Sequence, residues 1–171
     1  MAAVAPSGTT RPDPFDPDGV AWTPVSPRLA DVRRTVIGVT GAVLLIALTV
    51  IGFLTGHWWW VVADAVVLAA VGAGMVLAGR QAAAIGYAER EDDLLVRRGV
   101  MFRTLVVVPY GRMQYVDVQA GPLDRAFGIA QVQLYTASSG TDAAIPGLPP
   151  AEAARLRDRL ASRGQARLAG L

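Results

Sequence analysis

Two stretches of sequence decide the architecture of this chain: residues 35–55, TVIGVTGAVLLIALTVIGFLT, and residues 58–79, WWWVVADAVVLAAVGAGMVLAG. A helix needs about 20 mainly apolar residues to cross a membrane, and each stretch supplies them. Only Gly56 and His57 separate the two stretches, so we expect a tight antiparallel transmembrane hairpin spanning residues 35–79. The second span follows the first at once, which favours a permanent anchor over a removable signal peptide.

The arginines predict how the hairpin is oriented. The turn contains neither Arg nor Lys, whereas arginines flank both outer ends of the hairpin: Arg28, Arg33 and Arg34 before it, and Arg80, Arg90, Arg97 and Arg98 after it. Positive charge near the ends of a span favours the cytoplasmic side, and tryptophans favour the headgroup layer. We therefore expect a multi-pass plasma-membrane protein with both termini cytoplasmic and residues 58–60 (WWW) at the outer turn.

Asp64 is the sole charged residue within the two spans. An acid inside a membrane is by default a candidate for function, here as an intramembrane contact to a partner or as a proton relay. It lies six residues past Trp58, a rise of roughly 9 Å along a helix, so it can also reach the outer interface. We favour the interfacial interpretation, because the spans offer no second acid or base for a relay.

The chain outside the hairpin divides by composition. Residues 1–21 are rich in Pro, Gly, Asp and Thr and are predicted to be a disordered tail, followed by a juxtamembrane segment at 22–34. Residues 80–163 have the sequence pattern of a folded domain, and residues 164–171 are predicted to be a C-terminal tail. The Pro-rich start of the juxtamembrane segment forbids a helix there, and its Trp22 is expected to rest on the membrane or on the domain.

The domain is predicted to be built of antiparallel strands and one helix. Apolar or alternating runs stand at 84–88, 94–98, 101–108, 113–119, 130–136 and 143–145, separated by turn residues. The helix begins at residues 149–150 and carries Ala153, Leu156 and Leu160 on one stripe. We therefore predict an α+β membrane protein in which a small β-barrel of six to seven strands is capped by a C-terminal helix.

Several motifs in this order resemble the bacterial PH domain family and its YdbS-like membrane proteins. They include VPYGRMQYVDV at 108–118 and GPLDRAFGIA at 121–130, together with Tyr135-Thr-Ala-Ser, Ile145-Pro-Gly-Leu and Glu152-Ala-Ala-Arg-Leu. The resemblance covers about residues 22–160. It implies a PH-like fold after a two-span hairpin and a membrane location, and it implies no chemical activity.

Composition excludes most catalytic chemistry. The chain has no cysteine, one histidine and no lysine, because all 16 of its basic residues are arginine. This removes thiolate sites, histidine-based zinc sites and Schiff-base lysines. The acids at 89–93 share one turn, as a solvated charge run does. We expect no enzyme activity, no cofactor and no metal, and, with a formal net charge of only +2, no nucleic-acid partner.

Arginines are the better candidates for a binding site. Arg97 and Arg98 end one predicted strand and Arg103 begins the next, so they could converge on anionic headgroups; simple surface solubility is the alternative. Arg112, Gln114 and Arg125 carry the family resemblance. Each of these arginines could fix a loop through backbone carbonyls or line a binding face, and the sequence leaves both open.

The sequence thus predicts a membrane-anchored PH-like interaction module that recruits or scaffolds a protein partner, for example by adding a strand to an exposed sheet edge. The alternatives are an anionic-lipid headgroup sensor acting through Arg97, Arg98 and Arg103, and an accessory subunit of an envelope transporter or enzyme that uses Asp64. The expected partners are membrane lipids and an unknown membrane or cytoplasmic protein, with a second copy of the chain as a further candidate.

Overall fold

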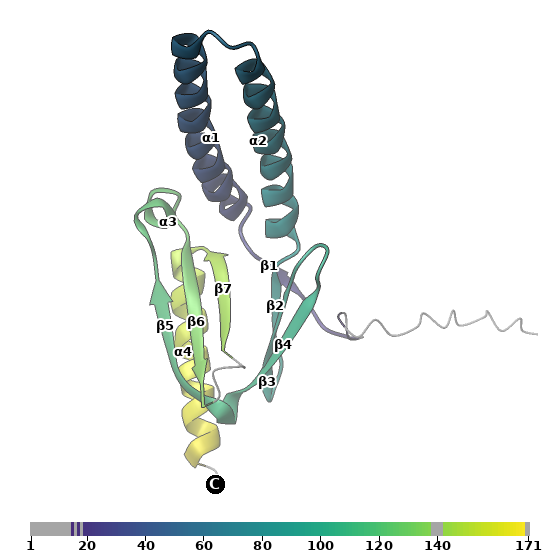
Figure 1. Ribbon diagram of the computed structural model, residues 1–171. Coiled ribbons are helices and arrows are strands. Elements are labelled where there is room, and N and C mark those ends of the chain that lie inside the picture. Colours follow the sequence, from purple (N-terminus) through teal and green to yellow (C-terminus); the bar gives the residue numbers. More distant parts are fainter. Residues whose placement is uncertain (1–14, 16, 18, 138–141, 170–171) are drawn as a thin grey trace, which may run out of the picture.

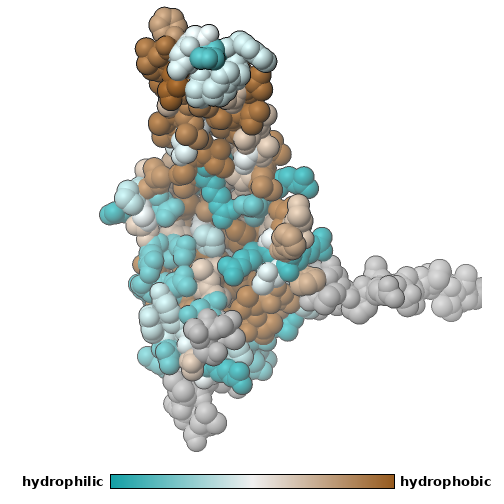
Figure 2. All heavy atoms as spheres, in the orientation of Figure 1, coloured by the Kyte–Doolittle hydropathy of each residue, from teal (hydrophilic) through white to brown (hydrophobic). Residues whose placement is uncertain are grey.

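A long helical hairpin stands on a domain of two sheets and a helix (Figure 1). The computed structural model describes residues 15, 17, 19–137 and 142–169, so most of the predicted disordered tail and the predicted turn at 138–140 lie outside the described residues. Apolar surface gathers over the hairpin, and polar residues dominate the domain below it (Figure 2). The surface of the hairpin therefore suits lipid, and the surface of the domain suits water.

The hairpin consists of α1 (Arg28–Thr55) and α2 (Trp59–Ala83), both apolar and long enough to cross a membrane. The helix α1 ends at Thr55 and is capped by Gly56, whose φ of 69° lies in the left-handed region that glycine adopts at low cost. Most side chains of the hairpin are exposed, as expected of helices surrounded by lipid. The predicted antiparallel hairpin is confirmed.

The two helices approach each other closely at small residues. A Cβ built on Gly41 would lie 2.3 Å from a Val71 methyl group, and one on Gly38 would lie 3.3 Å from Met75 Cε. Glycines of this kind let helix backbones pack tightly in a membrane, where no hydrophobic effect drives helices together. Close van der Waals packing at Gly38 and Gly41 therefore holds the two helices together.

The predicted juxtamembrane segment at 22–34 contributes residues to both the soluble domain and the hairpin. Its first part forms β1 (Thr23–Pro24), and α1 already begins at Arg28. Leu29 is only 6% exposed because it packs into the core of the soluble domain together with Val25. The domain therefore takes residues from both sides of the hairpin.

The first sheet has the order β1-β2-β3-β4, all antiparallel. It comprises β1, β2 (Gly86–Glu89), β3 (Asp93–Arg98) and β4 (Thr104–Pro109). The strand predicted at 84–88 begins in the structure at Gly86, and the strand predicted at 101–108 begins at Thr104. The apolar residues 101–102 lie in the turn before it rather than in the sheet.

The second sheet has the order β5-β6-β7 and is also antiparallel. It comprises β5 (Met113–Gln119), β6 (Ala130–Thr136) and β7 (Ala143–Leu148). The short 3-10 helix η1 (Tyr110–Arg112) precedes β5, and α3 (Pro122–Ala126) joins β5 to β6. In the part of the chain that the structure describes, the two sheets do not close into the predicted barrel, although the strand order is that of a PH-like fold.

The C-terminal helix α4 (Pro150–Ala169) packs against η1, β5 and β6 and covers the core. Ala153, Leu156 and Leu160 are fully buried, which confirms the apolar stripe predicted from sequence. The helix continues past residue 163, so residues 164–169 are helical rather than a tail. The core that α4 covers includes Leu94 and Val132, one from each sheet.

Candidate functional site

An arginine-lined hollow lies where the first sheet meets the domain end of α2. We call it the arginine groove. It consists of two adjoining cavities of about 440 and 720 Å³, which share Arg80, Arg98 and Thr104. Arg97 and Arg103 line the first cavity, and Arg33 lines the second. None of the described residues that line either cavity is acidic, so the groove is suited to an anion.

Strand pairing brings the predicted arginines to this place. The last two pairs of the β3–β4 ladder are Arg97 with Leu105 and Arg98 with Thr104. Gly99 then turns the chain at a φ of 105°, where a Cβ would lie within 1.9 Å of the carbonyl oxygen of Phe102. A side chain at position 99 would not fit this turn. The turn therefore directs the arginine-bearing ends of both strands toward α2 (Figure 1).

The arginines of the groove differ in how they are engaged. Arg97 stacks over the ring of Trp22 at 4.3 Å, so Trp22 rests on the domain, one of the two positions expected for it. Arg33 donates a hydrogen bond of 3.3 Å to Gln81 Oε1. By contrast, the side chains of Arg80 and Arg98 make no hydrogen bond or ion pair with any residue that the structure describes. Their guanidinium groups are available to a ligand.

One wall of the groove is apolar. Leu77 of α2 lies there opposite Met101 and Phe102 of the β3–β4 turn, and these two side chains are each 84% exposed. Leu77 stands one helical turn before Arg80, the first charged residue after the apolar span. The groove thus places cationic and apolar groups side by side at the boundary between hairpin and domain.

The other predicted site residues do not join the groove. Arg112 ends η1 and Gln114 follows it in β5, at the end of the domain away from the hairpin, and both are exposed (Figure 1). Arg125 lies on α3, at the opposite end of β5, and is exposed as well. In the described chain, neither arginine side chain bonds a backbone carbonyl, and the α3 loop is fixed instead by Asp124, which accepts from Gly121 N–H at 3.1 Å. Their role in binding stays a prediction.

Asp64 of α2 contacts α1 within the hairpin. Its Oδ2 accepts a hydrogen bond of 3.0 Å from the hydroxyl of Thr49 on α1. Its Oδ1 is buried and has no hydrogen-bond partner among the described residues. The contact ties α1 to α2 near the turn, and the role of Asp64 in an accessory subunit stays a prediction.

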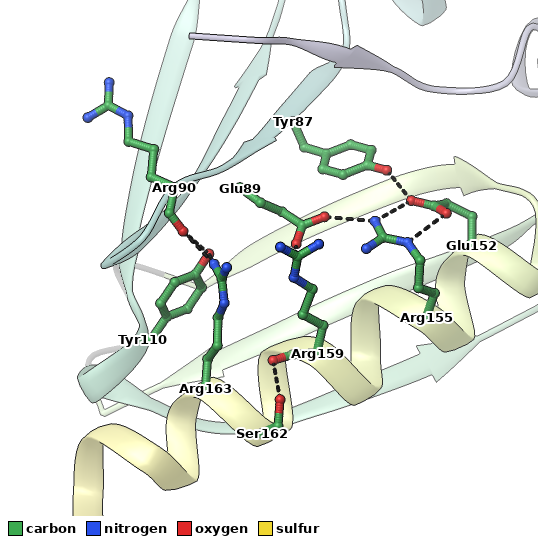
Figure 3. A network of polar contacts seen from close by, with 9 residues as sticks. All are labelled: Tyr87, Glu89, Arg90, Tyr110, Glu152, Arg155, Arg159, Ser162 and Arg163. Atoms are coloured by element: carbon green, nitrogen blue, oxygen red, sulfur yellow. Dashed lines mark hydrogen bonds and ion pairs between the residues drawn. The ribbon is translucent and has the colours of Figure 1, made fainter. Parts of the chain in front are cut away.

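A polar network fastens α4 to the first sheet (Figure 3). Glu152 accepts hydrogen bonds from the Tyr87 hydroxyl at 2.6 Å and from Arg155. Arg155 also pairs with Glu89 at 2.7 Å, and Arg159 approaches the second oxygen of Glu89 at 3.1 Å. Glu89 therefore sits between two guanidinium groups, which corrects its expected place in a solvated charge run: its side chain is only 13% exposed.

The network shifts the ionisation of its members. Hydrogen bonds from Arg155 and then from Tyr87 lower the pKa of Glu152 to about 2. Burial, followed by the bond to Glu152, raises the pKa of Tyr87 to about 12. Both groups therefore hold one charge state over the neutral range. We assign the network a structural role, because its side chains are mutually paired.

A second polar contact holds the far end of α4. The Tyr110 hydroxyl donates to the carbonyl of Arg90 at 3.0 Å, and Arg163 donates to that hydroxyl at 2.9 Å and to the same carbonyl (Figure 3). The ring of Tyr110 is fully buried, and burial raises the pKa of its hydroxyl. These bonds fix η1, and with it the start of β5.

Sequence reasoning missed part of the groove. From the sequence, Arg33 and Arg80 indicate only the orientation of the hairpin, and Met101 and Phe102 are predicted to lie in a strand. Gly99 was the available signal: a glycine directly after Arg98 is compatible with a turn that leaves the next residues outside the sheet. Nothing local indicates that this turn lies against α2, because that contact joins residues far apart in sequence.

Comparison with known proteins agrees with this architecture. The family model described as "Bacterial PH domain" matches residues 29–164. Over 74 residues the chain is 38% identical to the UPF0699 transmembrane protein YdbS of Bacillus subtilis (strain 168). That alignment covers 43% of this chain and 45% of that protein, so the chain matches less than half of its relative. No solved structure matches. With a two-helix membrane hairpin and a match across most of its length, the chain belongs to the bacterial PH domain family.

Proposed function

We propose that this membrane protein binds anionic lipid headgroups in the arginine groove, on the cytoplasmic side of the plasma membrane. The observation that carries the proposal is the pair Arg80 and Arg98, which line both cavities of the groove without a partner in the described chain. The role is one of binding rather than catalysis.

The chemistry of the groove supports this ligand. A guanidinium group offers a planar fork of N–H donors that matches a phosphate, and it keeps its charge at all physiological pH values. The groove brings Arg80 of α2 and Arg98 of β3 together with no acid among its described lining residues. A phosphate placed between them would bridge the hairpin and the domain.

The distribution of charge supports the cytoplasmic orientation. Residues 35–79 contain no arginine, so the arginines that the structure describes stand on the domain side of the hairpin. Such a bias favours the cytoplasm for that side. The cytoplasmic leaflet carries anionic lipids, and each basic residue near it contributes about 1 kcal/mol. The groove and its proposed ligand then occupy the same layer.

Native mass spectrometry of the full chain tests the proposal. The detergent-solubilised protein is offered equal amounts of phosphatidylglycerol and phosphatidylcholine, and the bound lipids are counted. We expect a preference for phosphatidylglycerol that R80Q/R98Q weakens roughly 30-fold, since two arginines contribute about 2 kcal/mol. The control R90Q/R157Q removes the same charge at exposed sites away from the groove and should keep the preference. Equal losses in both variants would contradict a specific site.

A second candidate function is recruitment of a protein partner at the edge of the first sheet. The strand β4 ends the sheet order and pairs only with β3 in the described chain, and Val107 on it is 44% exposed. An edge of this kind accepts a further strand. A photo-crosslinking residue at Val107, compared with one at Gln131 in native membranes, should capture a discrete partner only from Val107. Crosslinks to the chain itself would instead indicate a homo-oligomer.

A further inference from the structure

The turn between β3 and β4 presents two large apolar side chains outside the protein core. Met101 and Phe102 are each 84% exposed, although the sequence around them reads as a strand. The turn is imposed by Gly99, whose φ of 105° and contact with the Phe102 carbonyl exclude a side chain. The two residues are therefore held at the tip of a tight hairpin, where the sheet cannot cover them.

The position of the tip indicates what surrounds it. Met101 and Phe102 line the same cavity as Leu77 and Arg80, the residues at which the apolar surface of α2 gives way to charge. Figure 1 shows the β3–β4 turn rising beside the lower end of α2. The tip thus stands at the depth where a membrane that surrounds α2 changes from acyl chains to headgroups.

The residues around the tip fit that boundary. Arg98 is the last residue of β3, and Arg103 directly precedes β4. Arginine places its stem along apolar surface and its charge among headgroups, while an aromatic ring favours the interface itself. An apolar tip between two arginines has the pattern of a segment that enters one leaflet from the side.

We propose that Met101 and Phe102 form a second membrane contact, in which the β3–β4 turn inserts its apolar tip into the interfacial acyl region of the leaflet beside α2. The contact needs no charged lipid, so it goes beyond headgroup binding in the arginine groove. It fixes the domain against the membrane at a point separate from the hairpin. The groove then opens directly onto the lipids between the tip and α2.

Fluorescence quenching in the full chain tests this contact. Because the chain has no cysteine, F102C creates a single site for an environment-sensitive fluorophore. The labelled protein is placed in phosphatidylcholine nanodiscs that carry a nitroxide at a shallow acyl position. V50C within α1 serves as the positive control, and S162C on the exposed face of α4 serves as the negative control. M101C repeats the measurement, and neither substitution at the tip removes a core contact.

We expect the label at 102 to be quenched at least threefold more than the label at 162, equally in neutral nanodiscs and in nanodiscs with phosphatidylglycerol. A label at 102 that is quenched no more than at 162 would overturn the proposal. Blue-shifted emission without lipid quenching would also overturn it, because a protein surface would then cover the tip. Quenching only with phosphatidylglycerol would remove the tip as an independent contact and leave the headgroup proposal standing.

Discussion

At the scale of single residues, the carboxylate of Glu152 makes folding depend on pH. Its pKa in the folded protein is about 2, against an ordinary value of 4.5, because Arg155 and Tyr87 donate hydrogen bonds to it. A lowered pKa stabilises the fold above the ordinary value and loses that contribution as pH falls toward 2. We expect the melting temperature of the full chain in detergent to fall less steeply in E152Q than in wild type between about pH 5 and pH 3.

The matched control for this prediction is D158N, which removes a carboxylate on the same helix that pairs with its neighbour Arg157. Its melting profile should follow the wild type. If E152Q and D158N gave the same profile, the coupling of Glu152 to Tyr87 and Arg155 would contribute nothing to acid stability.

Gly99 is the second residue with a testable role of its own. At a φ of 105°, a Cβ would meet the carbonyl oxygen of Phe102, so G99A must distort the β3–β4 turn. We expect a loss of roughly 1–3 kcal/mol in the free energy of unfolding. Chemical denaturation measures it. The control is G111A, because a Cβ there meets no atom within 4 Å. Equal stability of the two variants would show that the turn adapts freely.

At the scale of elements, β1 and the first turn of α1 belong to the soluble domain. Val25 and Leu29 are buried in its core, and β1 pairs with β2. A fragment of residues 80–171 lacks these groups and leaves Ile85 and Tyr87 uncovered on one side. We expect the fragment to show no cooperative unfolding by circular dichroism. If so, residues 80–163 need the segment before the hairpin in order to fold.

Restoring the missing segment tests the same prediction about the fragment from the opposite direction. Joining residues 20–32 to residues 83–171 through a Gly/Ser linker restores the missing strand without the hairpin. Cooperative unfolding should return, and L29A should then cost about 2–5 kcal/mol, as is usual for a large core side chain. A fragment 80–171 as stable as the joined chain would contradict the prediction.

The packing of α1 against α2 depends on a glycine contact. A Cβ on Gly41 would lie 2.3 Å from Val71, whereas one on Gly72 would meet nothing within 4 Å. We expect G41L to separate the helices and lower the melting temperature in detergent by several degrees, and G72L to leave it unchanged. Thermal unfolding followed by light scattering compares them. Equal behaviour would place the hairpin contact elsewhere.

At the scale of the whole molecule, the orientation of the hairpin decides which leaflet the arginine groove meets. The absence of cysteine allows single labels at His57 in the turn and at Ser162 on α4. We expect a membrane-impermeant maleimide to label H57C in intact cells and to label S162C only after permeabilisation, because the arginines stand on the domain side. The reverse pattern would place the groove outside the cell and remove the basis of the headgroup proposal.

Much of the fold could be predicted because it depends on local patterns. The length of the apolar runs predicted the hairpin, and period-two alternation predicted β5 and β6 within their bounds. The stripe of Ala153, Leu156 and Leu160 predicted the packed face of α4. By contrast, β1 has two residues, one of them proline, and is too short to carry a pattern. Its pairing with β2 arises only because the hairpin returns the chain to the same place.

The part of the candidate site that depends on local sequence patterns could also be predicted. The convergence of Arg97, Arg98 and Arg103 follows from a hairpin turn between neighbouring strands, which the sequence indicates. The contribution of Arg80 does not, because it depends on how α2 lies against the sheet. Arg112 and Arg125 are close in sequence, but the extended strand β5 lies between them. They therefore stand at opposite ends of the domain.

By itself, the sequence of this protein determined that its hairpin lies in a membrane: residues 35–79 carry only one charged residue, and only a membrane suits so long and so apolar a hairpin. It also determined which side of the hairpin holds the arginines. Only the tertiary structure decided that Val25 and Leu29 complete the core and that Arg80 and Arg98 share one groove with Phe102. The physical reason is that a residue's solvent preference is local, whereas a binding surface is built from contacts between distant parts of the chain.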